Sequence, residues 1–342
     1  MRILMVGFGN VGQKIVELLS KPDRIKILSD LTPVFTGIFT ASHGAVVAEK
    51  GLSPLTCLEY FRGNNGFTPT LPYYYPGDII DAIDTLSYDV LVEVSTLSIT
   101  DRGEPALSYT EQALKHGKHV VLANKGPVAF GYKRLMTLAR TQAVKLLYES
   151  TVMDGTPVFS LARNGLTGCS VTGVTGILNS TTNYVLDGLR GGKSHDEVIQ
   201  EAQIIGVAEA DPRYDLDGWD CAAKLTILAN TLMGSDLTPM NISREEFRTV
   251  TPEMIRRAKS SGEYIRQVGS AWREKGRLKA QVAFRRFPAE DPFAFVRGTS
   301  SALRIETDCM CPQMIFQENP GLKDTAYGVI NDLMTIVRSG FE

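Results

Sequence analysis

The chain has 342 residues, and its 36 Lys and Arg against 38 Asp and Glu give a formal net charge of −2 at pH 7. A chain longer than roughly 250 to 300 residues usually divides into more than one hydrophobic core, so we expect two domains. The nearly balanced charge provides no basic surface for nucleic acid, and no apolar run reaches the about 18 residues that a membrane span requires. We therefore expect neither nucleic acid nor a membrane as a partner.

Short apolar strands alternate with helical patterns in the first part of the chain. The predicted strands cover residues 3–6, 35–39, 89–94 and 119–123. Such alternation is typical of a parallel sheet with helices on its faces. Residues 44–76 fit this pattern less well, because they contain several Gly, Asn and Pro residues, and we expect a helix and an elaborated loop there.

After about residue 135 the pattern changes to that of an α+β domain. Strands are predicted over residues 145–148, 170–174 and 279–284, with long helices between them. Ser194 and Glu197 have the spacing of a capping box, which predicts a helix through about residue 205. We therefore expect an α/β dinucleotide-type domain over residues 1–135 and a second domain over residues 136–314.

The cysteines indicate a reducing environment. Their number is odd and they form no C-x-x-C pair, and no signal peptide is visible, which together favour reduced thiols in a cytoplasmic protein. Cys309 and Cys311 could hold a metal, but no His or second Cys pair lies nearby in the sequence. A structural role for these thiols is therefore favoured.

The first predicted strand leads into the motif G-x-G-x-x-G, formed by Gly7, Gly9 and Gly12, and Asn10 and Val11 open the following helix. The first glycine permits a tight turn, the second lets the backbone approach a pyrophosphate, and the third lets the helix pack against the strand. An anion would then bind at the helix N-terminus. In this strand-turn-helix context the motif predicts a dinucleotide site of the Rossmann type.

The end of the second predicted strand indicates which dinucleotide is bound. An Asp or Glu there would accept hydrogen bonds from the 2′-hydroxyl of NAD, but the chain has Thr40, Ala41, Ser42 and His43 instead. Ser42 and His43 could donate to a 2′-phosphate, so NADP is favoured and NAD is possible. The alternative is that His43 is only a residue of a surface loop.

Two lysines follow elements that position them for chemistry. Lys125 comes directly after the fourth predicted strand, at the carboxyl end where open α/β sheets bind ligands, although a lysine there is often simply solvated. Lys224 stands four residues after Asp220 on a helix that begins near Trp219 and becomes strongly apolar, so the pair shares one helix face. A lysine held beside a carboxylate can donate a proton to a carbonyl oxygen as hydride arrives. A solvated acidic loop would explain the preceding acids alone, which are Glu209, Asp211, Asp215 and Asp217.

Four motifs in this order resemble homoserine dehydrogenase. They are GFGNVG, VVLANKGP, GILNSTTNYVL and EAQIIGVAEADPRYDLDGWDCAAKLTIL, and the similarity extends nearly from end to end. The resemblance implies the reversible NAD(P)H-dependent reduction of L-aspartate 4-semialdehyde to L-homoserine, on the route to threonine and methionine. It also implies that the second domain forms a homodimer and that a C-terminal segment, 315–342, completes the first domain with a helix over 326–337.

The resemblance also implies roles for individual residues. Lys224 and Lys125 are the candidate proton donors, Asp220 holds the substrate and the lysine, and Glu209 takes the ammonium group of the substrate. Polar contacts to the substrate carboxylate are implied for Asn179, Thr181 and Thr182. Contacts to the cofactor are implied for Gly7, Gly9, Asn10, Val11, Gly12, Ser42, His43, Ser95, Thr96 and Lys125.

A sodium ion bound by backbone carbonyls is a further implication of the resemblance. Its ligands would be the carbonyls of Glu149, Val152, Asp154 and Thr156. Met153 and Asp154 replace small residues that many members of the family have in this turn, although carbonyl ligands tolerate changes of side chain.

The sequence differs from the family pattern in two places, and two other functions remain as alternatives. A glycine-rich stretch near the C-terminus keeps only Gly321 over residues 319–326, and the chain ends at Glu342 without the regulatory domain of many members, so we expect no threonine feedback through such a domain. The alternatives are another amino acid dehydrogenase with the same two domains, such as an aspartate dehydrogenase, and a non-catalytic NADP(H) sensor.

Overall fold

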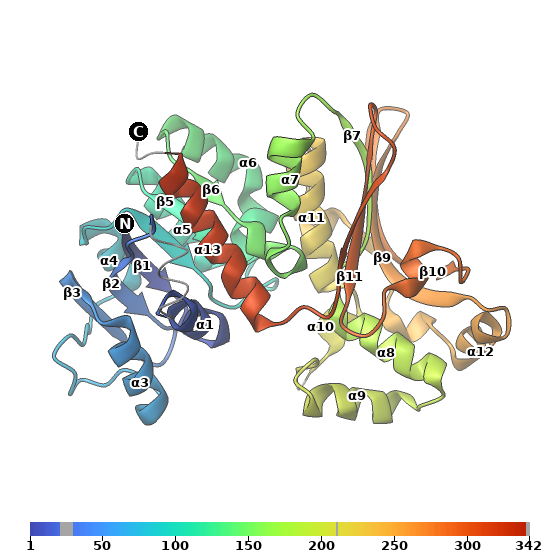
Figure 1. Cartoon of the computed structure of the whole chain (residues 1–342), viewed down its shortest axis with the longest axis horizontal. Coiled ribbons are helices and arrows are strands. Elements are labelled where there is room, and N and C mark those ends of the chain that lie inside the picture. Colours follow the sequence, from blue (N-terminus) through green and yellow to red (C-terminus); the bar gives the residue numbers. More distant parts are fainter. Residues whose placement is uncertain (21–29, 210, 340–342) are drawn as a thin grey trace. The chain divides into compact units, whose positions relative to one another are not determined.

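The structure is a computed structural model that describes residues 1–20, 30–209 and 211–339 (Figure 1). It divides the chain into two compact units. The first unit comprises Met1–Pro157 together with Gly321–Glu342, and the second comprises Val158–Pro320. The C-terminal segment therefore belongs to the first unit, but it begins at Gly321 rather than at the expected residue 315, because the chain up to Pro320 is part of the second unit.

The first unit is built on a six-stranded sheet with the order β3-β2-β1-β4-β5-β6. All neighbouring strands are parallel except β2 and β3, which are antiparallel. The strands are β1 (Arg2–Val6), β2 (Val34–Phe39), β3 (Ala45–Leu52), β4 (Val90–Glu93), β5 (His119–Leu122) and β6 (Leu146–Leu147). The four strands predicted for this domain correspond to β1, β2, β4 and β5, so the α/β class is confirmed.

The helices of this unit bury apolar side chains in its core to different extents. They are α1 (Asn10–Leu19), α3 (Pro54–Asn64), α4 (Ile79–Thr85), α5 (Ala106–Lys115), α6 (Gly126–Thr141) and α13 (Leu322–Arg338), with two short 3₁₀ turns, η1 (Glu149–Thr151) and η2 (Met153–Gly155). α13 lies beside α1, and its residues Val329, Ile330 and Leu333 are buried in the same core cluster as Ile15 (Figure 1). The terminal helix therefore completes the first unit, and it begins four residues earlier than predicted.

Two predictions for this part of the chain need correction. Residues 44–76 contain the predicted helix, but they also contain β3, which pairs with β2 at the edge of the sheet. The expected domain boundary at residue 135 falls inside α6, and the strand predicted over 145–148 is β6, which pairs in parallel with β5. The first unit therefore continues to Pro157, because this strand extends the first sheet rather than starting the second.

The second unit is an α+β arrangement, as expected. Its six-stranded sheet has the order β12-β11-β7-β9-β10-β8 and is antiparallel apart from the β8–β10 pair. The strands are β7 (Val171–Ile177), β8 (Ser243–Arg244), β9 (Tyr264–Glu274), β10 (Arg277–Phe287), β11 (Ser301–Thr307) and β12 (Gln313–Gln317). Sequence patterns predicted β7 and β10 and missed the other four strands.

Helices α8, α11 and α12 of this unit pack against β9. The helices and 3₁₀ turns are α7 (Val158–Gly165), α8 (Ser180–Gly191), α9 (His195–Ile204), α10 (Arg213–Leu216), α11 (Trp219–Met233), η3 (Pro239–Asn241), η4 (Phe247–Thr249), α12 (Pro252–Ser260) and η5 (Pro292–Phe295). The predicted capping box of Ser194 and Glu197 is present at the start of α9, and Gly192 ends α8 in a left-handed conformation. α11 begins at Trp219, as predicted, and is buried along most of its length.

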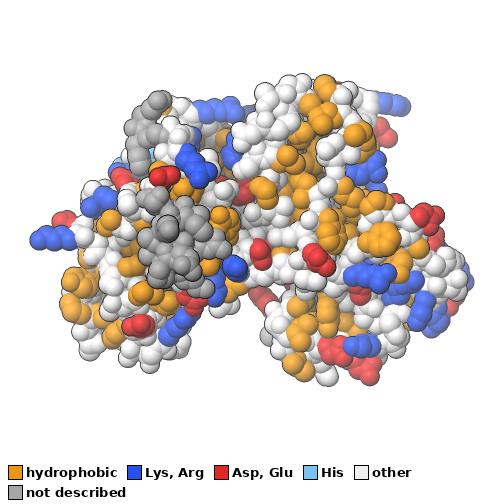
Figure 2. Space-filling view, viewed as in Figure 1, with side chains coloured by type: hydrophobic (Ala, Val, Ile, Leu, Met, Phe, Trp, Pro, Cys, Tyr) orange, Lys and Arg blue, Asp and Glu red, His pale blue; other side chains and the backbone are white. Residues whose placement is uncertain are grey.

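The visible surface carries charges of both signs, interspersed among uncharged side chains (Figure 2). This agrees with the nearly balanced composition. Within the described ranges, no helix combines the length and the apolar character that crossing a bilayer requires.

Candidate active site

The glycine turn between β1 and α1 has two crowded glycines and one open glycine. A Cβ atom on Gly7, whose φ is +97°, would lie 2.7 Å from the backbone nitrogen of Ser95, and one on Gly12 would lie 2.4 Å from the Gly7 carbonyl oxygen. A Cβ atom on Gly9 would meet nothing within 4 Å. The crowded positions allow close packing of the turn, whereas the open position leaves the backbone accessible to a phosphate.

The start of α1 is suited to an anion. Its N-cap is Gly9, which has no side chain to cap the helix. The first turn, which includes Asn10 and Val11, carries no acidic side chain. The N–H groups at a helix N-terminus lack partners within the helix and carry a partial positive charge, so they attract phosphate.

A cavity of about 510 Å³ adjoins this turn within the first unit. Its lining includes Gly7, Gly9, Ser42, His43, Ser95 and Thr96, which the sequence assigned to cofactor binding. Among the described residues, none that lines it is an Asp or Glu, so the described lining offers no carboxylate that would repel a 2′-phosphate. Ser42 and His43 are exposed, and the Ser42 Oγ lies 3.0 Å from the His43 Nδ1. The residues present therefore fit a dinucleotide, and they tolerate NADP.

A buried carboxyl group lies beneath one wall of this cavity. Glu93, at the end of β4, is fully buried, and its Oε1 accepts a hydrogen bond of 2.9 Å from the backbone nitrogen of Ser95. Its Oε2 has no hydrogen-bond partner in the described part of the chain. Burial raises the pKa of Glu93 to about 7, and hydrogen bonds from Ser95 and Asn124 oppose that rise. Sequence patterns gave no role to this residue.

Asn124 ties the ends of β4 and β5 together. Its Nδ2 donates to the Ser95 Oγ at 3.2 Å and to the Thr96 carbonyl at 3.3 Å, and its Oδ1 accepts from the backbone nitrogen of Gly126 at 2.8 Å. Lys125 is therefore held at the N-cap of α6, at the carboxyl end of the parallel strands, where the sequence predicted it. Its side chain is half-buried.

In the second unit, Lys224 and Asp220 form the predicted pair on one face of α11. The Lys224 Nζ lies 2.9 Å from the Asp220 Oδ2 and donates a 2.7 Å hydrogen bond to the Leu178 carbonyl. The side chains of the lysine and the aspartate are 13% and 12% exposed. Asn179 joins the pair, because its Nδ2 donates to the Asp220 Oδ2 at 3.0 Å. The network thus holds an ammonium group at the edge of a buried helix.

Asp215 completes this network and was not singled out by the sequence. The Asn179 Nδ2 donates to its Oδ1 at 2.7 Å, so one amide bridges Asp215 and Asp220. Burial and repulsion from Asp220 raise the pKa of Asp215, while Asn179, Thr181 and Lys224 act in the opposite direction. Two adjacent carboxylates share this site, and the charge of Asp220 makes Asp215 harder to ionise.

The threonines at the head of α8 hold the loop that follows α9 and the short helix α10. The Thr181 hydroxyl donates to the Val207 carbonyl at 2.9 Å, and the Thr182 hydroxyl donates to the Asp215 carbonyl at 3.0 Å. The Thr182 backbone nitrogen donates to the Oδ1 of Asn179, which caps the helix. These two residues therefore position the network through the backbone.

The other acids of this segment lie in different surroundings. Glu209 has an exposed side chain on the loop after α9, and its role in holding the substrate stays a prediction. Asp211 is exposed and pairs with Arg213, which lowers the pKa of Asp211 to about 2. The Asp217 carbonyl accepts a 2.6 Å hydrogen bond from Arg244.

The turn predicted to bind sodium is fastened to α13. The backbone nitrogen of Glu149 donates to Asp332 at 2.8 Å, and the Asp154 Oδ1 accepts from the Thr325 hydroxyl at 3.3 Å. Met153, Asp154 and Gly155 have φ values of 54°, 48° and 83°, so the backbone coils tightly here. In the described ranges, no group of three or more His, Cys, Asp or Glu side chains could hold a metal, so a cation would depend on the carbonyls.

Comparisons with known proteins agree over the whole chain. The family model for homoserine dehydrogenase matches residues 157–334, and the model for the NAD binding domain of homoserine dehydrogenase matches residues 7–149. The NAD(+)-dependent homoserine dehydrogenase of Pseudomonas canavaninivorans is 32% identical over 99% of this chain and 96% of its own length. The homoserine dehydrogenase of Methanocaldococcus jannaschii is 33% identical over 99% of both chains.

A solved structure gives the same result at the level of the fold. It is a hyperthermophilic archaeal homoserine dehydrogenase in complex with NADPH, and it matches with a TM-score of 0.83 and 27% identity. The match covers 99% of this chain and 98% of that one.

Proposed function

The chain belongs to the homoserine dehydrogenase family, and from this premise we propose how its residues interconvert L-aspartate 4-semialdehyde and L-homoserine. The first unit binds NAD(P)H, which supplies a hydride when bound. The second unit binds the amino acid. The observation that carries this proposal is the buried network of Lys224, Asp220, Asn179 and Asp215.

Lys224 is the proton donor in this proposal. During reduction, hydride adds to the aldehyde carbon, and the negative charge that develops on the oxygen takes a proton from the Lys224 ammonium group, giving the alcohol. Asp220 and the Leu178 carbonyl hold the ammonium group in place, so the donor is already positioned when the proton is transferred. In the oxidation of homoserine the neutral amine accepts the proton back. Lys125 is the second candidate for this role.

The substrate is a zwitterion, and the second unit offers partners for both of its charges. The carboxylates of Asp215 and Asp220, together with Glu209, provide negative charge for the ammonium group. The head of α8, where Asn179, Thr181 and Thr182 lie, provides N–H groups and a favourable dipole for the carboxylate.

NADP is the favoured cofactor in this proposal, with NAD also accepted. The described part of the cavity lining holds no acid, and Ser42 and His43, just after β2, can donate to a 2′-phosphate. Both dinucleotides occur among the related proteins, one of which is NAD(+)-dependent and one of which was solved with NADPH.

The sodium site is proposed at the carbonyls of Glu149, Val152, Asp154 and Thr156. The chemistry of the donor set supports it, because backbone carbonyl oxygens are ligands that hard cations prefer. A cation here would stiffen the turn that joins η1 and η2 to α13.

We further propose that the enzyme is a cytoplasmic homodimer that pairs through the second unit. β12 is an edge strand of the second sheet, and its Met314 and Phe316 are exposed. Apolar side chains on an open edge strand favour pairing with another chain. The cysteines are free thiols, which suits a reducing compartment. Analytical ultracentrifugation tests the dimer.

The test of the function is the nicotinamide absorbance of the purified protein with L-homoserine and either NAD or NADP, beside a Lys224→Ala control. Homoserine-dependent reduction of the cofactor, lost in the control, supports the proposal and establishes the cofactor. Binding of both dinucleotides without turnover on homoserine would refute it.

A further inference from the structure

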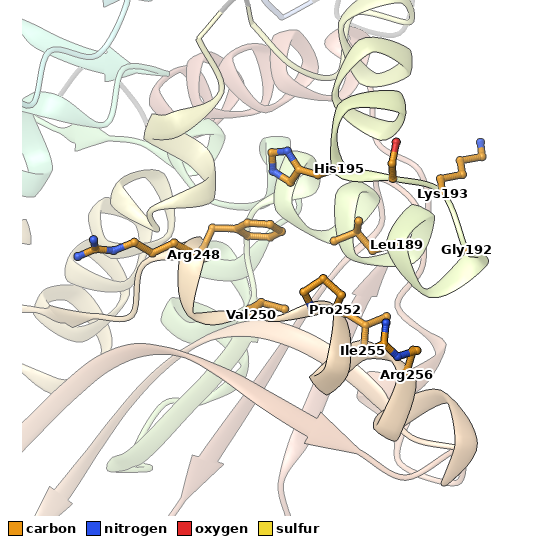
Figure 3. A pocket seen from close by; sticks show the side chains of 11 residues that line it. Leu189, Gly192, Lys193, His195, Arg248, Val250, Pro252, Ile255 and Arg256 are labelled. Atoms are coloured by element: carbon orange, nitrogen blue, oxygen red, sulfur yellow. The ribbon is translucent and has the colours of Figure 1, made fainter.

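A second cavity lies in the second unit, lined by none of the residues of the Lys224 network. Its volume is about 570 Å³, and its walls come from the end of α8, the turn into α9, η4 and the start of α12 (Figure 3). We refer to it as the α8–α12 basin. Its apolar lining consists of Leu189, Phe247, Val250, Pro252 and Ile255. A volume of this size is typical of sites for small molecules.

The apolar floor of the basin is held in place from behind. Phe247, Val250 and Ile255 are less than 10% exposed and belong to one buried core cluster of the unit. The Phe247 ring also packs edge-on against Phe284, with centroids 5.8 Å apart. Because the floor residues are fixed by the core, they cannot collapse to fill the basin, and a ligand with an apolar body can cover them.

The charged side chains around the basin are basic. Lys193, Arg248 and Arg256 line it beside His195, and no Asp or Glu of the described residues does. His195 stands over the floor with its imidazole 5.6 Å from the Phe247 ring, whereas Lys193 and Arg248 extend outward on opposite sides (Figure 3).

These cations are paired with acids that do not line the basin. Lys193 lies 2.6 Å from Glu201, Arg256 lies 2.8 Å from Glu253, and Arg248 pairs with Glu246. All these side chains are exposed, and exposed ion pairs contribute little to stability. The long side chains can therefore exchange these partners for an anionic group in the basin at small cost.

We propose that the α8–α12 basin binds a small organic anion with an apolar body, of the class of aromatic or branched aliphatic carboxylates. The apolar body covers the floor, and the carboxylate is held by the surrounding cations. A zwitterionic amino acid is disfavoured, because no carboxylate among the described lining residues could hold its ammonium group. The basin thus differs from the network at Asp215 and Asp220, which has the carboxylates that an amino acid requires.

Three matched probes test this ligand class in the full-length protein. They are 4-phenylbutyrate, the neutral 4-phenylbutan-1-ol and the zwitterionic L-phenylalanine, and their Kd values are measured by saturation-transfer NMR. NADPH and L-homoserine are both present at saturation, a combination that cannot react, so that the catalytic sites are occupied. We expect the Kd of 4-phenylbutyrate to be at least about fivefold lower than those of the other two probes. A ratio of this size is what one favourable contact between opposite charges contributes.

Charge reversal around the basin then locates the site. We expect the Arg248→Glu/Arg256→Glu variant to weaken 4-phenylbutyrate binding about tenfold or more, and Leu189→Asp to do the same by placing a carboxylate in the basin. The matched control is Arg277→Glu, an exposed arginine at the start of β10, which should leave the Kd unchanged. The circular dichroism spectrum and the unfolding temperature establish that each variant is folded.

The proposal is overturned if 4-phenylbutyrate does not bind, if the neutral or zwitterionic probe binds as tightly, or if folded basin variants bind it like the Arg277→Glu control. These outcomes are independent of the proposed dehydrogenase activity, since the basin shares no residue with the Lys224 network.

Discussion

The Lys224 Nζ lies 2.9 Å from the Asp220 Oδ2, one helical turn apart on α11, and both side chains are nearly nine-tenths buried. The ammonium group is therefore fixed at a defined position beside Asn179 and the Leu178 carbonyl. Buried pairs of this kind contribute little net stability, so this one is better explained by the chemistry that it positions.

Removing the Lys224 ammonium should abolish most of the turnover without preventing cofactor binding. We expect Lys224→Ala to lower kcat for homoserine oxidation by about 10² to 10⁴, the usual contribution of a general acid or base, while the Kd of NADPH, measured by fluorescence, stays the same. Lys279→Ala, an exposed lysine on β10, is the control. An equal loss in Lys125→Ala with activity retained in Lys224→Ala would assign the proton transfer to Lys125.

The glycine turn makes a prediction that separates binding from folding. Gly9→Ala should keep the unfolding temperature and raise the KM of the dinucleotide about tenfold, because its methyl group enters open space where the phosphate approaches. Gly12→Ala should destabilise the protein, because its Cβ would lie 2.4 Å from the Gly7 carbonyl. Thermal unfolding and steady-state kinetics of the two variants check both outcomes. Equal unfolding temperatures for the two would contradict this account of the turn.

The acidic segment before α11 shows where sequence reasoning reaches its limit. The pair on α11 could be predicted because i, i+4 spacing on an apolar helix is a local property. Among the preceding acids, only the fold distinguishes Asp215, which meets Asn179, from Asp211, which pairs with Arg213 in solvent. The carboxylates look alike in the sequence, and the partner that distinguishes Asp215 lies 36 residues away along the chain.

The strands of the fold were predictable only where a local pattern marks them. Buried parallel strands such as β1 and β4 have continuous apolar runs, and these were identified. β3 is an edge strand that includes the exposed Glu49 and Lys50, so its pattern resembled a loop. β6 has only two residues, and its parallel pairing with β5 is a long-range property that no local pattern reveals. The family resemblance supplied the function, which the comparisons confirm.

Cofactor preference should respond to a carboxylate at the end of β2. We expect Ser42→Asp to raise the KM of NADP by tenfold or more through repulsion of the 2′-phosphate, with the KM of NAD unchanged or lower. Ser42→Asn, which has a similar size and no charge, is the control. Steady-state kinetics with both cofactors measure the ratio. Parallel changes for NAD and NADP would show that residue 42 does not lie near the 2′ position.

The buried carboxyl of Glu93 should make stability depend on pH. Burial raises its pKa from the ordinary 4.5 to about 7, so between these values the folded state keeps a proton that the unfolded state has lost. The wild-type protein therefore loses stability as the pH rises through this window. The full effect is about 3 kcal/mol, from roughly 1.4 kcal/mol for each pH unit.

Glu93→Gln removes this titration and keeps an oxygen that can accept the hydrogen bond from Ser95. We expect the free energy of unfolding of the variant, relative to wild type, to rise by about 3 kcal/mol between pH 4.5 and pH 8 in urea denaturation. The absolute offset includes the cost of a buried amide N–H group, so the slope with pH is the informative quantity. Glu49→Gln, an exposed residue of β3, should show no such slope. A difference between Glu93→Gln and wild type that is constant across this range would mean that Glu93 keeps the same protonation state in the folded and unfolded protein.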